Sequence, residues 1–169
     1  MSPPAVDGEL ARSLVTTVPN VFRHMLSHAR RRPAWADMTY QQYNVLRIIT
    51  EGEASQGEIA RRLMVTAPVV TRLASALVEE GLVERREDPA DRRSVRLAIT
   101  RQGKKQVEAM RKDLVEAARE LLEPLAQEDR SAIAGALEQL QLLFPDRSSA
   151  AERAAAAEAP PPVDPSAAR

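Results

Sequence analysis

Residues 82–99 read LVERREDPADRRSVRLAI and differ in periodicity from the sequence on both sides. Every second residue from Val95 to Ile99 is apolar, which is the spacing of a half-buried β-strand. The segment from Leu82 to Arg86 is interpreted as a second strand. Between them, residues 88–93 hold the proline and the charged residues that are typical of a turn. The sequence therefore predicts one small β-hairpin.

Upstream, apolar residues recur at three- and four-residue steps from Leu10 to Ala29, which predicts an amphipathic helix. Pro19 lies inside this helix and removes one of its hydrogen bonds. We therefore expect a kink near Val18 or a new helix that starts there. Pro33 is expected to end this helix.

Two pairs of residues have the form of a capping box, Thr39 with Gln42 and Ser55 with Glu58. In a capping box each side chain bonds the backbone N–H of the other residue at the start of a helix. The pairs therefore predict the starts of a second helix, which is expected to end at Gly52, and of a short third one.

A fourth helix is expected to begin at Thr66 and to end before Gly81, which suits the position after a helix. Only Met64 and Val65 separate it from the third helix, and so tight a connection is typical of a helix-turn-helix. Three helices followed by a charged hairpin is the order of a winged helix-turn-helix. The predicted fold class is mainly α with a small β-hairpin.

After the hairpin, Thr100 is expected to cap a long helix that Pro124 bends or ends, and a last helix follows Asp129. The helices at the two ends of the chain are amphipathic, and no third layer is available to cover their apolar faces. The sequence therefore predicts a helical dimerisation domain and a homodimer.

In a helix-turn-helix, the N-terminal half of the second helix enters the major groove of DNA. Its predicted outward face carries small side chains and one cation, Arg72, which can pair with guanine edges. The helix-turn-helix residues expected to contact DNA are Ser55, Thr66, Pro68, Val69, Thr71, Arg72 and Ser75.

The hairpin adds five arginines, a residue type that narrow minor grooves attract: Arg85, Arg86, Arg92, Arg93 and Arg96. Surface arginines are often only solvated charges, and charges on a sheet edge also protect against aggregation. Five at and beside one turn exceed what edge protection needs. The total charge of the chain gives no further indication of DNA binding, because its 24 basic and 24 acidic residues cancel.

Two stretches resemble the MarR family of bacterial transcription regulators. Residues 91–103, DRRSVRLAITRQG, look like its wing signature, and residues 77–83, LVEEGLV, look like the end of its recognition helix. The resemblance covers about residues 10–144. It implies a homodimer with interlocked N- and C-terminal helices and two winged lobes on a pseudo-palindromic operator. It also implies that Arg93 enters the minor groove and that Asp91 steadies the wing.

These inferences divide the chain into four parts. The expected parts are a flexible N-terminus (1–9), a helical dimerisation region (10–34 and 104–144), a winged DNA-binding region (35–103) and a disordered Ala- and Pro-rich tail (145–169). No apolar run is long enough to span a membrane, and the first residues lack the layout of a signal peptide. A bacterial cytoplasmic protein with no membrane association is expected.

Neither catalysis nor a cofactor is expected. The chain has no cysteine and only two histidines, His24 and His28, so it offers no nucleophile and base set, and its six glycines form no phosphate loop. The two histidines lie one helical turn apart, which is a spacing for zinc ligands. Zinc sites need three or four ligands, so the pair is more simply interpreted as surface or interface residues.

Members of the family often bind small aromatic acids or drugs in a crevice between the dimerisation and winged regions. The residues on the elements that would border it are Phe22, Met25, His28, Trp35, Met38, Tyr43 and Arg47, and packing at a hinge explains them equally well. The expected function is a sequence-specific regulator that binds double-stranded DNA, a repressor released by a small aromatic or amphipathic effector. The alternatives are a winged-helix protein-interaction module without DNA binding, and a metal-responsive regulator that uses His24 and His28.

Overall fold

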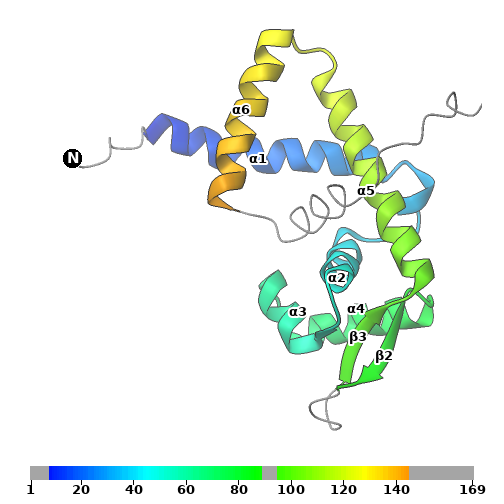
Figure 1. The fold of residues 1–169 in the computed structure, drawn as a ribbon. Coiled ribbons are helices and arrows are strands. Elements are labelled where there is room, and N and C mark those ends of the chain that lie inside the picture. The colour runs from blue at the N-terminus through cyan, green and yellow to red at the C-terminus, as the bar shows by residue number, and fades with distance from the viewer. Residues whose placement is uncertain (1–7, 89–94, 145–169) are drawn as a thin grey trace, which may run out of the picture. The chain divides into compact units, whose positions relative to one another are not determined.

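A computed structural model describes residues 8–88 and 95–144 of the 169-residue chain (Figure 1). Residues up to Ala126 form one compact unit and the remainder a second, so the last helix is described by itself. The predictions for residues 1–7 and for the tail 145–169 lie outside the described residues. None of the described helices is long and apolar enough to cross a membrane.

Helix α1 spans Gly8–Ala29 without interruption, and Pro19 lies inside it. Of the two expected outcomes, the start of a new helix near Val18 is therefore wrong. Proline removes one N–H bond but has a fixed φ that suits a helix, so the turns on both sides keep the chain helical. Toward its C-terminal end, α1 contributes Met25, Leu26 and Ala29 to the core, and it contacts helix α5.

The winged region contains the helices α2 (Tyr40–Thr50), α3 (Gln56–Leu63) and α4 (Ala67–Glu79). Both predicted capping boxes are present, with Thr39 accepting from Gln42 N and Ser55 accepting from Glu58 N. After α4, Gly81 has φ +70° and the N–H of Leu82 donates to the carbonyl of Leu77 at 2.9 Å. These bonds satisfy carbonyls that the end of a helix would otherwise leave unpaired.

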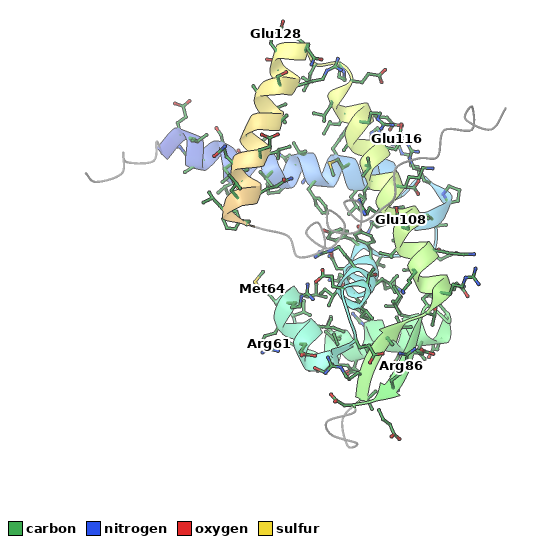
Figure 2. All side chains as sticks on the ribbon, viewed as in Figure 1. Arg61, Met64, Arg86, Glu108, Glu116 and Glu128 are labelled. Carbon is green, nitrogen blue, oxygen red and sulfur yellow. The ribbon has the colours of Figure 1, made fainter. Side chains whose placement is uncertain are left out.

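The turn between α3 and α4 depends on a left-handed residue that is not glycine. Met64 has φ +53°, and its N–H bonds to the carbonyls of Ala60 and Arg61 at the end of α3. Its side chain is almost fully exposed and projects away from the two helices (Figure 2). The conformation is uncommon for such a side chain, and it produces the abrupt change of direction that a helix-turn-helix requires.

Three antiparallel strands form the sheet, β1 (Ala54–Ser55), β2 (Val83–Glu87) and β3 (Val95–Ile99), in the order β1-β3-β2. The predicted hairpin is confirmed as β2 and β3. Strand β1 was not predicted, because two residues are too few to show a periodic pattern. The hairpin tip, residues 89–94, lies outside the described residues.

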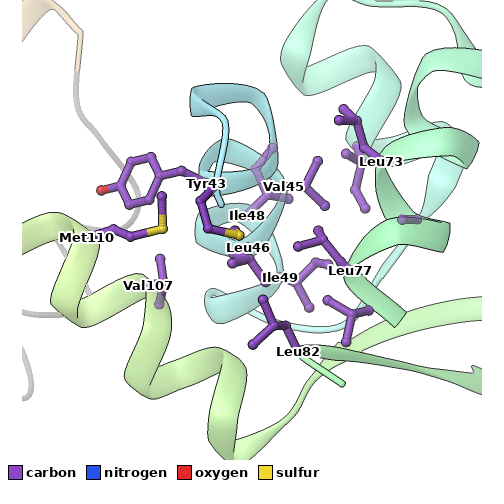
Figure 3. Close-up of a cluster of buried hydrophobic side chains, with 14 of the residues drawn as sticks. Tyr43, Val45, Leu46, Ile48, Ile49, Leu73, Leu77, Leu82, Val107 and Met110 are labelled. Atoms are coloured by element: carbon purple, nitrogen blue, oxygen red, sulfur yellow. The ribbon is translucent and has the colours of Figure 1, made fainter. Parts of the chain in front are cut away.

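Helix α2 lies between α5 (Arg101–Leu122) and α4 and carries the centre of the core (Figure 3). Leu46 and Ile49 of α2 are buried, as are Leu77 of α4 and Met110 of α5. Because α5 starts directly after β3 and packs on α2, one helix leads from the wing into the predicted dimerisation region.

A short 3-10 helix, η1 (Pro33–Trp35), connects α1 to the same core. The indole N–H of the buried Trp35 donates to the carbonyl of Met110 at 3.1 Å, and the side-chain amide of Gln106 donates to the carbonyl of Ala34 at 2.8 Å. Two hydrogen bonds therefore fix η1 to helix α5.

At Gly103, the first turn of α5 packs closely against the segment that connects α4 to β2. The hydroxyl oxygen of Thr100 accepts from Gly103 N at 3.0 Å and donates to the carbonyl of Gly81 at 2.8 Å. A Cβ atom on Gly103 would lie 2.1 Å from the carbonyl oxygen of Leu82. The close approach of these two segments therefore requires glycine at this position.

Helices α1 and α6 (Gln127–Leu143) expose apolar side chains to solvent. In α1 the exposed apolar residues are Leu10, Leu14, Val15, Val18 and Val21. In and just after α6 they are Ile133, Leu137, Leu140, Leu142, Leu143 and Phe144, and α6 contains no buried residue. Such faces usually mark contact surfaces.

Candidate nucleic-acid interface

Arg72 is the cationic side chain on the outward face of α4. It is exposed, and within the described part of the chain it makes no hydrogen bond or ion pair. The positions one turn before and after it are the exposed Pro68 and the half-buried Ser75 and Ala76. A guanidinium flanked by small side chains can approach the edge of a base pair closely.

Thr71 and Ser75, which were predicted to contact DNA, are bonded within the protein. The hydroxyl of Thr71 donates to Gln56 Oε1 at 2.8 Å and is also 3.0 Å from the carbonyl of Ala67. Ser75 Oγ accepts from Arg85 at 3.1 Å. These contacts join α4 to the start of α3 and to strand β2, so both side chains help to hold the helix in place.

The other predicted helix-turn-helix positions differ in exposure. Thr66 and Pro68 are exposed at the N-terminus of α4, whereas Val69 is half-buried and packs against the core. Ser55 is half-buried because it caps α3. The exposed side chains around the start of α4 are therefore accessible to a ligand, whereas Val69 and Ser55 are partly covered by the protein.

Arg86 and Arg96 form ion pairs on one face of the sheet. Arg86 pairs with Glu84 on its own strand and with Glu53, and its NH1 atom lies 2.5 Å from Glu53 Oε1. Arg96 donates to Asp88 at 3.1 Å and to the backbone carbonyl of Glu53 at 2.6 Å. The hydrogen bonds to Glu84 and Asp88 raise the pKa values of Arg86 and Arg96 respectively, because they favour the charged guanidinium groups.

Glu58 connects this sheet face to the first turn of α3. Its side chain accepts from the backbone N–H of Ser55 at 2.7 Å, and Arg96 lies 3.4 Å from the same carboxylate oxygen. The hydrogen bonds to the backbone and side chain of Ser55 hold the pKa of Glu58 below its usual range, and the positive charge of Arg96 acts in the same direction. Sequence reasoning identified Glu58 only as a capping residue.

The remaining hairpin residues of the predicted interface are Asp91, Arg92 and Arg93, which lie outside the described residues. Their roles in the minor groove and in the wing therefore remain predictions. Of the five hairpin arginines, the described ones, Arg85, Arg86 and Arg96, all have partners within the protein.

Residues predicted to border an effector crevice form much of the core between α1, η1, α2 and α5. Trp35, Met38 and Tyr43 are buried, with the rings of Trp35 and Tyr43 5.5 Å apart. Phe22 and Met25 are half-buried, and Phe22 packs edge-on against Tyr40 at 4.7 Å. Tyr40 extends this aromatic cluster and was not among the residues predicted to border the crevice.

Arg47 and His28 lie at the margins of this region and have acidic neighbours. Arg47 NH1 lies 3.6 Å from Glu51 Oε1, and His28 Nδ1 lies 3.4 Å from Glu120 Oε2. His24 and His28 bring their rings within 4.6 Å. Among the residues that the structure describes, no three His, Cys, Asp or Glu side chains are grouped to hold a metal ion.

Comparisons with known proteins agree with this geometry. A sequence model of the MarR family matches residues 36–94. The uncharacterized HTH-type transcriptional regulator Mb0904 of Mycobacterium bovis is 29% identical over 143 residues, which are 84% of this chain and 96% of that protein. The similar regulator YdgJ of Bacillus subtilis is 27% identical over 89 residues; the match covers 53% of this chain and about half, 54%, of that relative.

Solved structures have the same fold. The transcriptional regulator Tm0710 of Thermotoga maritima is 28% identical with a TM-score of 0.62, over 80% of this chain and 94% of that one. Apo MarR of Escherichia coli has a TM-score of 0.65 at 22% identity, over 83% of this chain and 98% of that one.

A helix-turn-helix packed on a small antiparallel sheet, followed by a long helix, defines a winged helix-turn-helix protein. The comparisons support a transcription regulator of the MarR family, whose sequence model matches residues 36–94. The protein is accordingly a regulator and not an enzyme, as the sequence predicted.

Proposed function

We propose that this regulator acts as a homodimer that binds a pseudo-palindromic operator in double-stranded DNA and represses transcription there. The observation that carries the proposal is Arg72, an exposed cation on the N-terminal half of α4 without a partner among the described residues. Its neighbours in α4 are tied to α3 and β2, so the helix that carries it is held rigidly. Rigid elements position base-reading side chains better than loops do.

Replacing Arg93 or Arg72 with alanine is expected to weaken operator binding in different ways. Loss of Arg93 should cost about 1–3 kcal/mol and reduce the preference for A·T-rich flanks, because an arginine in a narrow minor groove responds to groove width and potential. Loss of Arg72 should relax the preference at one or two base pairs. Binding titrations against operator variants at fixed salt measure both effects.

Arg101→Ala provides the matched control, because Arg101 is an exposed arginine in the first turn of α5 that is not among the proposed DNA contacts. It should change affinity little and leave base preference unaltered. Unchanged affinity in both the Arg72 and the Arg93 variants would contradict the proposed interface.

A protein-interaction module that does not bind DNA is the competing function. Salt dependence separates the two, because phosphate contacts release counterions and make the affinity for duplex DNA fall steeply with salt. Binding to duplex DNA that is undetectable even at low salt would favour the interaction module.

We further propose that a small aromatic or amphipathic effector releases the repressor by changing the separation of the two winged lobes. Recognition helices of a dimer must lie about 34–36 Å apart to enter successive major grooves, so a small displacement lowers affinity. Trp35 supports a test of this proposal, because its indole bonds to α5 and it packs against Tyr43 of α2.

An effector that moves the winged lobe is therefore expected to change the fluorescence of Trp35, the only tryptophan, at concentrations that release DNA. The measurement is a screen of aromatic carboxylates and divalent metal ions with both readouts. Release by zinc alone, with unchanged Trp35 fluorescence for every organic compound, would favour the histidine pair. Absence of release by any compound would contradict effector control.

A further inference from the structure

The outer face of the wing sheet places two arginines directly opposite each other. Arg86 of β2 and Arg96 of β3 are register partners, and Ser55 of β1 is the partner of Arg96 on its other side. Like charges at directly opposed positions destabilise a sheet. Here the acidic residues Glu53, Glu58, Glu84 and Asp88 surround the pair and offset the repulsion.

Arg96 is the better enclosed of the two. Its side chain is 26% exposed and that of its partner Asp88 is 17% exposed, whereas the side chain of Arg86 is 53% exposed. One guanidinium nitrogen of Arg96 bonds Asp88, and the other bonds the carbonyl of Glu53 and approaches Glu58. A guanidinium can donate to acceptors that lie in different directions, because its N–H groups form a rigid planar fork.

The three partners of Arg96 belong to three different parts of the winged region. Asp88 follows the end of β2 at the base of the hairpin tip, and Glu53 precedes β1. Glu58 lies in the first turn of α3, where it completes the capping box with Ser55. One side chain thus links the wing to the first helix of the helix-turn-helix.

We propose that Arg96 is a positioning residue that holds the wing at a fixed orientation relative to α3 and α4, and that it does not contact DNA. This inference rests on the proposed DNA-binding function. It revises the expectation that every hairpin arginine contacts DNA. A guanidinium that reached for a phosphate would have to leave Asp88 and Glu58, and their negative charges would then face the DNA.

The first test compares salt dependence. Arg96→Met is expected to weaken operator binding about tenfold at fixed salt, which corresponds to about 1.4 kcal/mol, and to leave the slope of log affinity against log salt unchanged. A phosphate contact would instead reduce the slope by about 1. The measurement is made well below the melting temperature of each variant, so that loss of folded protein does not contribute. Arg101→Met is the control for loss of one positive charge.

The second test uses conservative replacement. Arg96→Lys keeps the charge but cannot bond Asp88 and the Glu53 carbonyl through a planar fork. It should therefore recover little of the lost affinity. In the Arg96→Met background, Asp88→Asn should add no further loss, because the two residues act as a pair. Full recovery by lysine, or independent effects of the two substitutions, would overturn the proposal.

The third test does not involve DNA. Amide hydrogen exchange of the free full-length protein should be faster in Arg96→Met both in β2 and in the first turn of α3, because one side chain connects them. Unchanged exchange in either segment would overturn the coupling even if the protein did not bind DNA. Failure of the wild type to bind duplex DNA, together with the expected exchange, would contradict only the proposed function and leave the link between wing and helix supported.

Discussion

Replacement of Gly103 by alanine is expected to lower the free energy of unfolding by about 3 kcal/mol, at the upper end of what one added methyl group costs in a packed site. The new Cβ would lie 2.1 Å from the backbone carbonyl oxygen of Leu82 and 2.8 Å from Cγ1 of Ile99. The Ile99 side chain can rotate away. The carbonyl of Leu82 cannot move without disturbing the end of α4 and the start of the wing.

Gly103→Ala should also affect DNA binding, because the hydrogen bonds next to Gly103 join the start of α5 to the start of the wing. The carbonyl of Leu82 accepts from the backbone N–H of Thr100 at 3.1 Å and is 3.1 Å from the Thr100 hydroxyl, which also caps α5. Separating Gly103 from Leu82 would stretch these bonds together. We therefore expect Gly103→Ala to change the angle between α5 and the wing and to reduce operator affinity as well.

Chemical denaturation measures the stability effect, and Gly57→Ala is the matched control. Gly57 lies in helix α3, and a Cβ atom there would meet nothing within 4 Å. Alanine is favoured over glycine in a helix by about 1 kcal/mol, so this variant should be as stable as the wild type or more stable. Equal stability of the two variants would show that the chain relaxes at Gly103 without cost.

Local signals in the sequence were sufficient for most element boundaries. The capping boxes at Thr39 and Ser55 were predicted from residue types three positions apart, and both form as expected. Gly81 was predicted to follow a helix and has the positive φ that this position requires. These signals are readable because each depends on neighbours within one helical turn.

Pairings between distant segments were not predictable in the same way. Arg96 was identified as a DNA contact, but its partners Glu53 and Glu58 lie 43 and 38 residues away in sequence and reach it only through the sheet. Strand β1, which brings them there, has only two residues. The hydrogen bond from the Trp35 indole to the carbonyl of Met110 could not be predicted for the same reason, because nothing in the local sequence of Trp35 indicates it.

A single negative charge on the exposed apolar face of α1 is expected to dissociate the proposed homodimer. Leu14 is 51% exposed, and Leu10, Val18 and Val21 lie on the same side of the helix. A dimer would remove this face from water, and burying an unpaired carboxylate there costs several kcal/mol. Leu14→Glu should therefore raise the dissociation constant by about 100-fold or more, since about 1.4 kcal/mol corresponds to a factor of ten.

Sedimentation velocity over a range of protein concentrations measures the dissociation, and circular dichroism verifies that the monomer remains folded. Thr16→Glu is the control, because Thr16 is exposed on the opposite side of α1, where its hydroxyl bonds the carbonyl of Arg12. It should leave the dimer intact. The Leu14 variant should also lose most of its affinity for a two-half-site operator, since a monomer engages one half-site at a time. A Leu14 variant that sediments as the wild type does would place the interface elsewhere and leave the apolar face of α1 without its proposed role.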